Sequence, residues 1–395
     1  MRTRDAIALL IWLGFAGPIH GASQGSDPCA IRELRKSESQ APPVYSPDRN
    51  RYLAKKEDKN GIAQIYVGKT GSAELTCLTC EQRPGGPKPQ RFKVMPAWHP
   101  SGKWIFLGSE RDSYHKPPVL GWNRKFVEGE IESGMWIDMY AVTPDGSRWS
   151  RLTDFTGDKG NPAGYTGPGF TSDGKKAIWS QIADANILVY WPFGRWELIL
   201  ADLEEVDGMP RLVNLKNITP KGMNWNEAAG FLADDESVPL SGSTEKDAQG
   251  MDQYILNVRT GELTNLTKTP AIWDEHGVFS PDGEKMIFMS AYPYRADPKS
   301  SAFMSLKTEF MLINKDGSDL RQLTHFQTPG YPEYGHGIAA VPLWAADGRS
   351  AILASLVFPD YEYWEIVFAG ACGNRLEPST RGRGRGKGRG RAFGR

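Results

Sequence analysis

The chain has 395 residues, with 47 Lys and Arg against 47 Asp and Glu, so its formal net charge is zero. Seven of the basic residues and no acidic residue lie in 381–395, which leaves 40 basic against 47 acidic residues in the remainder. A surface that binds nucleic acid is basic, so this composition argues against a specific nucleic-acid partner. The 43 Gly, the 28 Pro and the lack of any sustained helical periodicity instead indicate many short strands and an all-β fold.

The first 23 residues have the pattern of a secretory signal peptide. Arg2 and Arg4 precede an apolar run at 6–17, and small residues follow at 21–23. The run is too short to cross a bilayer, and no later stretch approaches the ~18 uninterrupted apolar residues of a membrane span. We therefore expect residues 1–23 to be removed on export. The mature chain is expected to be soluble, without a transmembrane segment, in the periplasm or outside the cell.

One pattern recurs six times after this leader. Each copy has an opening aromatic residue, a turn such as Ser-Pro-Asp-Gly, an apolar strand, a further strand and, in five copies, a Leu-Thr or Ile-Thr pair. In such a turn Pro restricts φ, Asp bonds to nearby backbone and Gly accepts a positive φ, so each copy predicts a hairpin. The opening aromatics are Tyr45, Trp98, Phe170, Phe231, Phe279 and Trp344.

These copies predict a six-bladed β-propeller with four-stranded antiparallel blades over residues 43–373. A four-stranded blade buries its faces only against neighbouring blades, so six blades must close into a ring. The sixth copy lacks its fourth strand, and we expect the N-terminal segment 24–42 to donate it through residues 30–34 and close the ring. The fourth copy is the least regular, because Asp235 replaces the turn glycine and Pro239 is expected to interrupt its strand.

The copies resemble the WD-like repeats of TolB-type propellers over about residues 43–370. The fifth copy is the closest match, with Ser-Pro-Asp-Gly at 280–283 and Leu-Thr at 323–324. The resemblance implies the propeller fold. Because such propellers serve as binding platforms, as enzyme domains and as partners in larger assemblies, it implies no single function.

Six polar residues are candidates for a ligand site at one mouth of the central channel. Residues just before each opening aromatic are expected in loops at that mouth, where ligand sites are common. Carboxylates and imidazoles converging there suit a divalent cation, a cationic group or a sugar, although no metal motif of fixed spacing accompanies them. The alternative is that they bond to loop backbone or to water in a wet channel. The candidates are Glu227, Asp274, Glu275, His276, Glu333 and His336.

Aromatic residues are concentrated in the segments that we expect as insertions between strands, at 114–136, 190–196, 292–294 and 361–364. Exposed rings with arginines nearby suit stacking on sugars or peptides. The alternative is that the long loops fold back and bury these rings as small additional cores.

The four cysteines predict disulfides in an oxidising compartment. Cys29 and Cys372 flank the two ends of the ring, so we predict that they form a disulfide that fastens the sixth blade. Cys77 and Cys80 are separated by two residues. A local structural disulfide or two free thiols fits this pair better than a redox centre or half of a zinc site, because no second Cys pair accompanies it.

No phosphate-binding loop and no His-Glu-x-x-His pattern occurs, and we assign no catalytic residue. The favoured interpretation is a monomeric, non-catalytic recognition propeller that binds a protein partner or a saccharide through one face of the ring. The alternative is a metal-assisted polysaccharide lyase or hydrolase, since the blades also resemble those of oligogalacturonate lyases, which place a metal near the channel. Glu227, Glu275, His276 and His336 would then be its polar groups.

The last segment, 374–395, is rich in Arg and Gly and is expected to be disordered. Alternating Arg and Gly offers no apolar face that could offset the entropy cost of ordering. Its positive charge suits weak, salt-dependent binding to anionic polymers, and a solvated tail without a role is the alternative.

Overall fold

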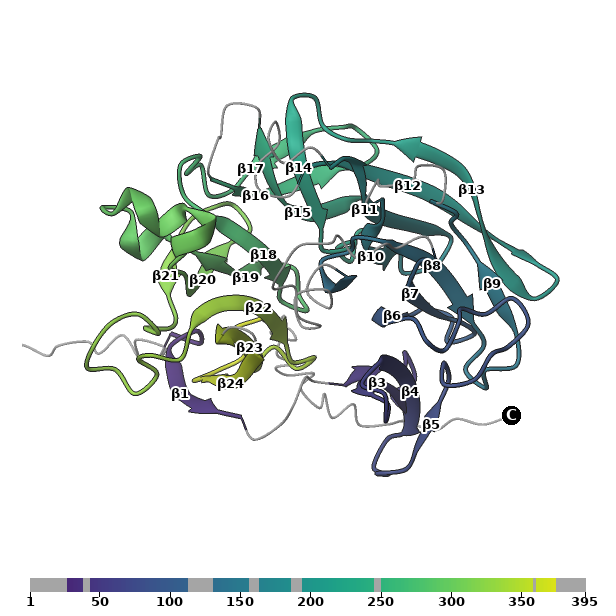
Figure 1. Cartoon of the computed structure of the whole chain (residues 1–395). Coiled ribbons are helices and arrows are strands. Elements are labelled where there is room, and N and C mark those ends of the chain that lie inside the picture. The colour runs from purple at the N-terminus through teal and green to yellow at the C-terminus, as the bar shows by residue number, and fades with distance from the viewer. Residues whose placement is uncertain are drawn as a thin grey trace, which may run out of the picture.

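The computed structural model describes residues 27–37, 43–112, 131–155, 163–185, 194–244, 250–357 and 360–373. The expected signal peptide and the Arg/Gly-rich tail lie outside these residues. The described residues form six four-stranded antiparallel sheets, one for each predicted blade, and Figure 1 shows them arranged in a ring. The structure confirms the six-bladed β-propeller.

The six blades follow one another along the chain. Blades 1 to 3 consist of β2 (Val44–Tyr45), β3 (Arg51–Glu57), β4 (Ala63–Lys69) and β5 (Leu75–Cys77); β6 (Lys93–Trp98), β7 (Ile105–Glu110), β8 (Ile137–Val142) and β9 (Trp149–Arg151); and β10 (Tyr165–Phe170), β11 (Lys176–Asp184), β12 (Arg195–Val206) and β13 (Met209–Asn217). Blades 4 to 6 consist of β14 (Met223–Ala228), β15 (Ser237–Thr244), β16 (Asp252–Asn257) and β17 (Leu263–Asn265); β18 (Asp274–Phe279), β19 (Lys285–Ser290), β20 (Glu309–Asn314) and β21 (Arg321–Gln322); and β22 (Ile338–Trp344), β23 (Ser350–Val357), β24 (Asp360–Phe368) and β1 (Ile31–Lys36).

The N-terminal strand completes blade 6, as expected. β1 pairs antiparallel with β24, with Leu34 opposite Ile366, and becomes the fourth strand of that blade. Cys29, just before β1, and Cys372, just after β24, are both buried and form a disulfide with a Cα–Cα distance of 4.6 Å. The predicted pairing is therefore present. The first and last segments of the ring are joined by a strand pairing and by a covalent bond.

The second cysteine pair forms a local disulfide, which decides between the two alternatives left open by the sequence. Cys77 and Cys80 are bonded with a Cα–Cα distance of 5.7 Å. The two residues between them are the Leu78-Thr79 pair that closes blade 1. This disulfide therefore constrains the end of one blade and does not connect two blades.

The repeated turns are stabilised by their own side chains. In blade 5 the Ser280 hydroxyl donates to Asp282 and accepts from the backbone N–H of Lys285, which closes the hairpin between β18 and β19. The fourth copy departs from one expectation, because β15 continues through Pro239 to Thr244. The carbonyl of Pro239 accepts a hydrogen bond from the N–H of Ala229, just beyond the end of β14. Proline has no N–H to donate, and here the missing donor lies at the point where the pairing of β14 with β15 ends.

The threonine of each Leu-Thr or Ile-Thr pair joins the fourth-strand end of its blade to the third strand. In the five blades that carry the pair, the Thr hydroxyl oxygen accepts from a backbone N–H of the third strand. In four of them the hydroxyl also donates to the preceding third-strand side chain, which is Gln64, Asp138, Asp252 or Glu309. The threonine of the pair thus fastens the end of the fourth strand to the third strand by hydrogen bonds. This structural role was not apparent in the sequence.

The two faces of the ring differ in their connections. Figure 1 places β6, β10 and β18 toward the middle and β9, β13 and β21 at the rim. Because the chain reverses at each strand, connections between strands 1 and 2 and between strands 3 and 4 share one face, which we call the turn face. Connections between strands 2 and 3 and between successive blades share the other face, which we call the insertion face. The long connections 291–308 and 323–337 both lie on the insertion face.

The connection 291–308 contains three short helices. They are 3-10 helices at Tyr292–Tyr294, Pro298–Ser301 and Phe303–Ser305. In the described part of the chain no helix has the length and apolar character needed to span a membrane.

Candidate functional site

Two carboxylates and one imidazole meet where blades 4 and 5 adjoin. Glu227 lies on β14, and Glu275 and His276 lie on β18. One ligand atom from each of the three side chains lies within 4.8 Å of the others. The closest recorded approach is 3.4 Å, between His276 Nε2 and Glu227 Oε2. The structure therefore brings together three of the six residues that the repeat register selected.

These residues lie in the innermost strands and not in loops, which corrects the expectation from the sequence. The inner strands begin before the predicted position, so Glu227, Asp274, Glu275 and His276 are all strand residues. The strand continues through a β-bulge, because the register between β18 and β19 shifts between Glu275 and Val278. His276 has a positive φ of 54° at this bulge. A bulge changes the direction of a side chain, and here it places His276 beside Glu227.

Neighbouring side chains support the bulge. The backbone N–H of His276 donates to Ser241 Oγ over 3.0 Å, and Gln253 Nε2 donates to the same oxygen over 3.0 Å. Gln253 Nε2 also donates to the carbonyl of Asp274 over 2.8 Å. A Cβ at Gly277 would lie 2.1 Å from Gln253 Oε1, so a larger residue at this position would displace the Gln253 side chain. The side chains of blade 4 therefore hold the backbone of blade 5 in this conformation.

His276 and Glu275 each have a further partner. His276 Nδ1 lies 3.1 Å from the carbonyl oxygen of Ala340 on β22, and since a carbonyl only accepts, Nδ1 carries the proton. Trp273 Nε1 donates to Glu275 Oε2 over 2.8 Å. Glu227 differs, because its Oε2 is buried and accepts no hydrogen bond from the described residues.

The electrostatics of the three groups are coupled. Burial raises the pKa of the Glu227 carboxyl group, His276 opposes this rise and Glu275 adds to it. Burial lowers the pKa of the His276 imidazole, but Glu275, Glu227 and the Ala340 carbonyl outweigh burial, so its pKa is raised. The two carboxylates thus favour a positive charge between them, supplied by the imidazolium or by a bound cation.

Asp274 belongs to the packing between blades and not to this cluster. Its carboxylate is buried and accepts from the hydroxyls of Ser290 and Thr269, and the backbone N–H of Thr269 donates to Asp252 of blade 4. Burial raises the pKa of Asp274 to about 7, although both hydroxyl donors lower it. These hydrogen bonds through Thr269 place Asp274 in the contact between blades 4 and 5.

Glu333 and His336 lie apart from the cluster, on the connection 323–337. Glu333 accepts from the backbone N–H of His325, and His336 Nδ1 lies 2.8 Å from Glu362 Oε2 on β24. The repeat register explains why blade 6 adds no carboxylate to the cluster. Glu227 and Glu275 lie four positions before the opening aromatic of their blades, but the residue four positions before Trp344 is Ala340. Blade 6 therefore contributes only a backbone carbonyl at this position.

The aromatic residues of the insertions divide between the two alternatives. Trp196 and Trp364 are buried in the core, and the hydroxyl of Tyr294 donates to the buried carboxylate of Glu309. Tyr361, by contrast, is 45% exposed at the start of β24. Parts of 114–136 and 190–196 lie outside the described residues.

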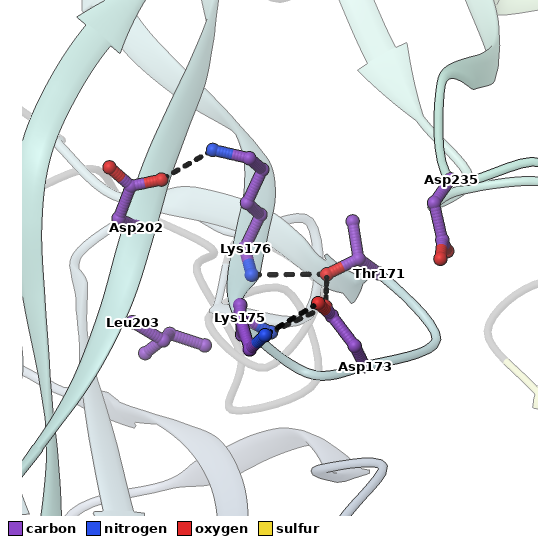
Figure 2. Close-up of a pocket in the computed structure, with 7 residues that line it drawn as sticks. All are labelled: Thr171, Asp173, Lys175, Lys176, Asp202, Leu203 and Asp235. Carbon is purple, nitrogen blue, oxygen red and sulfur yellow. Dashed lines mark hydrogen bonds and ion pairs between the residues drawn. The ribbon is translucent and has the colours of Figure 1, made fainter.

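A depression of about 390 Å³ lies on the opposite, turn face, between blades 3 and 4. Figure 2 shows its lining residues, in which Lys176 pairs with Asp202 and Lys175 pairs with Asp173. Asp235 accepts from the backbone N–H and the hydroxyl of Ser172. The charged groups of this depression already have partners, so it lacks the convergent free groups of a ligand site.

No protein-family model matches the sequence, and no curated protein matches it either. Among solved structures, the putative TolB of Agrobacterium tumefaciens is 17% identical, covering 76% of this chain and 82% of that chain, with a TM-score of 0.47. TolB of Acinetobacter baumannii is 13% identical, covering 85% of this chain and 64% of that chain, with a TM-score of 0.45. An oligogalacturonate lyase in complex with manganese is 12% identical, covering 83% and 89%, with a TM-score of 0.44.

Likeness at this distance concerns the fold alone, and this chain spans less than two thirds of the Acinetobacter protein. The classification depends on features of the chain itself. These are six four-stranded blades, repeated turns of the Ser-Pro-Asp-Gly type and the closing Leu-Thr pairs. In its fold the chain is a six-bladed β-propeller, and its repeats resemble those of TolB-type propellers.

Proposed function

We propose that the chain is an exported, monomeric recognition module that binds a protein partner or a saccharide through the insertion face. The observation that carries this proposal is the asymmetry of the ring. The long connections 291–308 and 323–337 lie on the insertion face, whereas the described turns of the other face are short hairpins. Binding residues are commonly carried on loops that a rigid scaffold positions.

The side chains of this face support the proposal. Tyr331 is 45% exposed, Tyr334 is 50% exposed and Tyr361 is 45% exposed, and Met304 is 84% exposed. The ring of Tyr331 stacks on His325 with a centroid distance of 3.7 Å and an interplanar angle of 4°. Exposed aromatic rings with a polar tip can pack on a sugar or on a peptide while their hydroxyl groups form hydrogen bonds.

The cysteines support export. All four cysteines of the sequence are present in two disulfides, Cys29–Cys372 and Cys77–Cys80. Disulfides of this kind persist in oxidising compartments such as the periplasm and the extracellular space. This is consistent with the signal-peptide pattern at residues 1–23, and we propose the periplasm or the cell exterior as the location.

We predict that Tyr334→Ala and Tyr361→Ala each weaken binding of the ligand about tenfold or more, because truncating a central aromatic contact typically costs about 1–3 kcal/mol. Candidate ligands are a panel of neutral, amino and uronic-acid oligosaccharides, together with envelope proteins that cross-link to a photoreactive residue at position 334. Affinities are then measured by calorimetry with the purified chain.

Matched controls lie on the turn face, where Val206 and Leu320 are 43% and 37% exposed. Val206→Ala and Leu320→Ala are expected to leave the affinity unchanged. Equal losses from both faces, or a photoreactive residue at 320 that captures the same partner, would exclude the insertion face as the binding surface.

A second candidate function is a metal-assisted polysaccharide lyase or hydrolase. The proximity of Glu227, Glu275 and His276 favours it, because a general base and a metal ligand are needed at one place. His336, the fourth polar group considered for this function, pairs with Glu362 instead. The test is the appearance of new chain ends in uronic-acid and neutral polysaccharides. Activity that Glu275→Gln does not abolish would exclude this site as the catalytic centre.

A further inference from the structure

The imidazole ring of His276 has the orientation and the hydrogen bond that are typical of a histidine that binds a metal ion. Its Nδ1–H donates to the Ala340 carbonyl on the neighbouring blade, and this contact directs Nε2 toward Glu227, with 3.4 Å between Nε2 and Oε2. Histidines that bind metals usually donate their other N–H to a carbonyl or a carboxylate, which determines the tautomer and the ring orientation. Nε2 is therefore the nitrogen available to a third group, and the Ala340 contact comes from outside the cluster.

The carboxylates provide the second observation. Glu227 Oε2 is buried and accepts no hydrogen bond from the described residues, although the side chain as a whole is 23% exposed. Glu275 is 6% exposed, and one of its oxygens accepts from Trp273. Buried polar atoms are normally partnered, and a buried carboxylate is costly without a positive charge. A bound cation would partner Glu227 Oε2 and offset the repulsion between the two carboxylates.

We propose that Glu227, Glu275 and His276 form a binding site for one divalent transition-metal ion, with Zn²⁺ and Mn²⁺ as the representative class. An imidazole ligand disfavours Ca²⁺ and Mg²⁺, which prefer all-oxygen ligand sets. Three protein ligands leave at least one coordination position open. That open position suits an oxygen donor from the ligand that we propose for the insertion face. The contact between this ligand and the metal ion rests on the proposed function, whereas the metal site itself does not.

The test is calorimetric titration of Zn²⁺ into purified, chelator-treated full-length chain. We expect one saturable site per chain and an increase in melting temperature on Zn²⁺ addition, since an ion that binds only the folded state stabilises it. His276→Asn keeps a donor near the Ala340 carbonyl but removes Nε2, and Glu227→Gln removes one charge while keeping the shape. Each is expected to weaken Zn²⁺ binding by roughly tenfold or more.

Glu333→Gln and His336→Asn change the same residue types outside the cluster and are expected to stay within about twofold of the unsubstituted chain, because neither residue lies in the cluster. Circular dichroism of all four variants checks that the propeller has folded. Absence of a saturable Zn²⁺ site, unchanged affinity in His276→Asn and Glu227→Gln, equal losses in the two controls, or displacement of Zn²⁺ by a tenfold excess of Ca²⁺ would each overturn the proposal. The tyrosine variants of the insertion face test the recognition function separately, so the two proposals can fail independently.

Discussion

Replacing Cys29 and Cys372 together by Ser is expected to lower the free energy of unfolding by about 3–5 kcal/mol. The disulfide joins residues separated by 343 positions, so its removal greatly enlarges the unfolded ensemble. β1 is also held by its pairing with β24 and by an ion pair between Asp27 and Arg321 of blade 5, and these contacts lose their covalent anchor. The expected consequence is an earlier opening of blade 6.

Urea denaturation followed by circular dichroism measures this effect, and hydrogen exchange of β1 and β24 locates it. The matched control is the double replacement of Cys77 and Cys80 by Ser. That disulfide closes a loop with a sequence separation of 3, for which the chain-entropy model predicts only about 2 kcal/mol. If the two double variants lose equal stability, ring closure is not what the Cys29–Cys372 disulfide contributes.

Thr324→Val is expected to lower the free energy of unfolding by about 2–4 kcal/mol, because it leaves a buried charged group with one donor fewer. The Thr324 hydroxyl accepts from the N–H of Phe310 over 2.9 Å and donates to Glu309 Oε2 over 2.7 Å. Glu309 is fully buried, and its other donors are the N–H groups of 326 and 327 and the hydroxyl of Tyr294. Valine preserves the shape of threonine and removes both hydrogen bonds.

The control is Thr219→Val in blade 3. Thr219 accepts from the N–H of Leu198 in the same way, but its hydroxyl donates to Asn217, an exposed contact. Both hydrogen bonds lost there are neutral, and the one to Asn217 is exposed, so the expected cost is about 1 kcal/mol. Chemical denaturation of both variants gives the comparison. A Thr219→Val cost equal to that of Thr324→Val would show that the buried carboxylate is not the reason for the effect.

The repeat pattern was sufficient to predict the architecture. Turn residues and apolar strands depend on local chemistry, so the Ser-Pro-Asp-Gly copies could be recognised and counted along the chain. The missing fourth strand of the last copy and the positions of Cys29 and Cys372 then predicted how the ring closes, and the structure contains both the strand pairing and the disulfide. The register of the copies also selected Glu227 and Glu275 as equivalent positions in neighbouring blades.

Only the tertiary structure decided the geometry of the candidate site. The direction of His276 depends on a bulge at a positive φ, and contacts from the two neighbouring blades support it, through Ser241 and Gln253 of blade 4 and Ala340 of blade 6. No local signal marks these contacts, because the residues are far apart in the sequence and each is ordinary in its own segment. The same cause placed Glu333 and His336 elsewhere, since a long connection has no repeat register from which its course could be predicted. Sequence periodicity determined the blades, and packing between blades determined which polar groups meet.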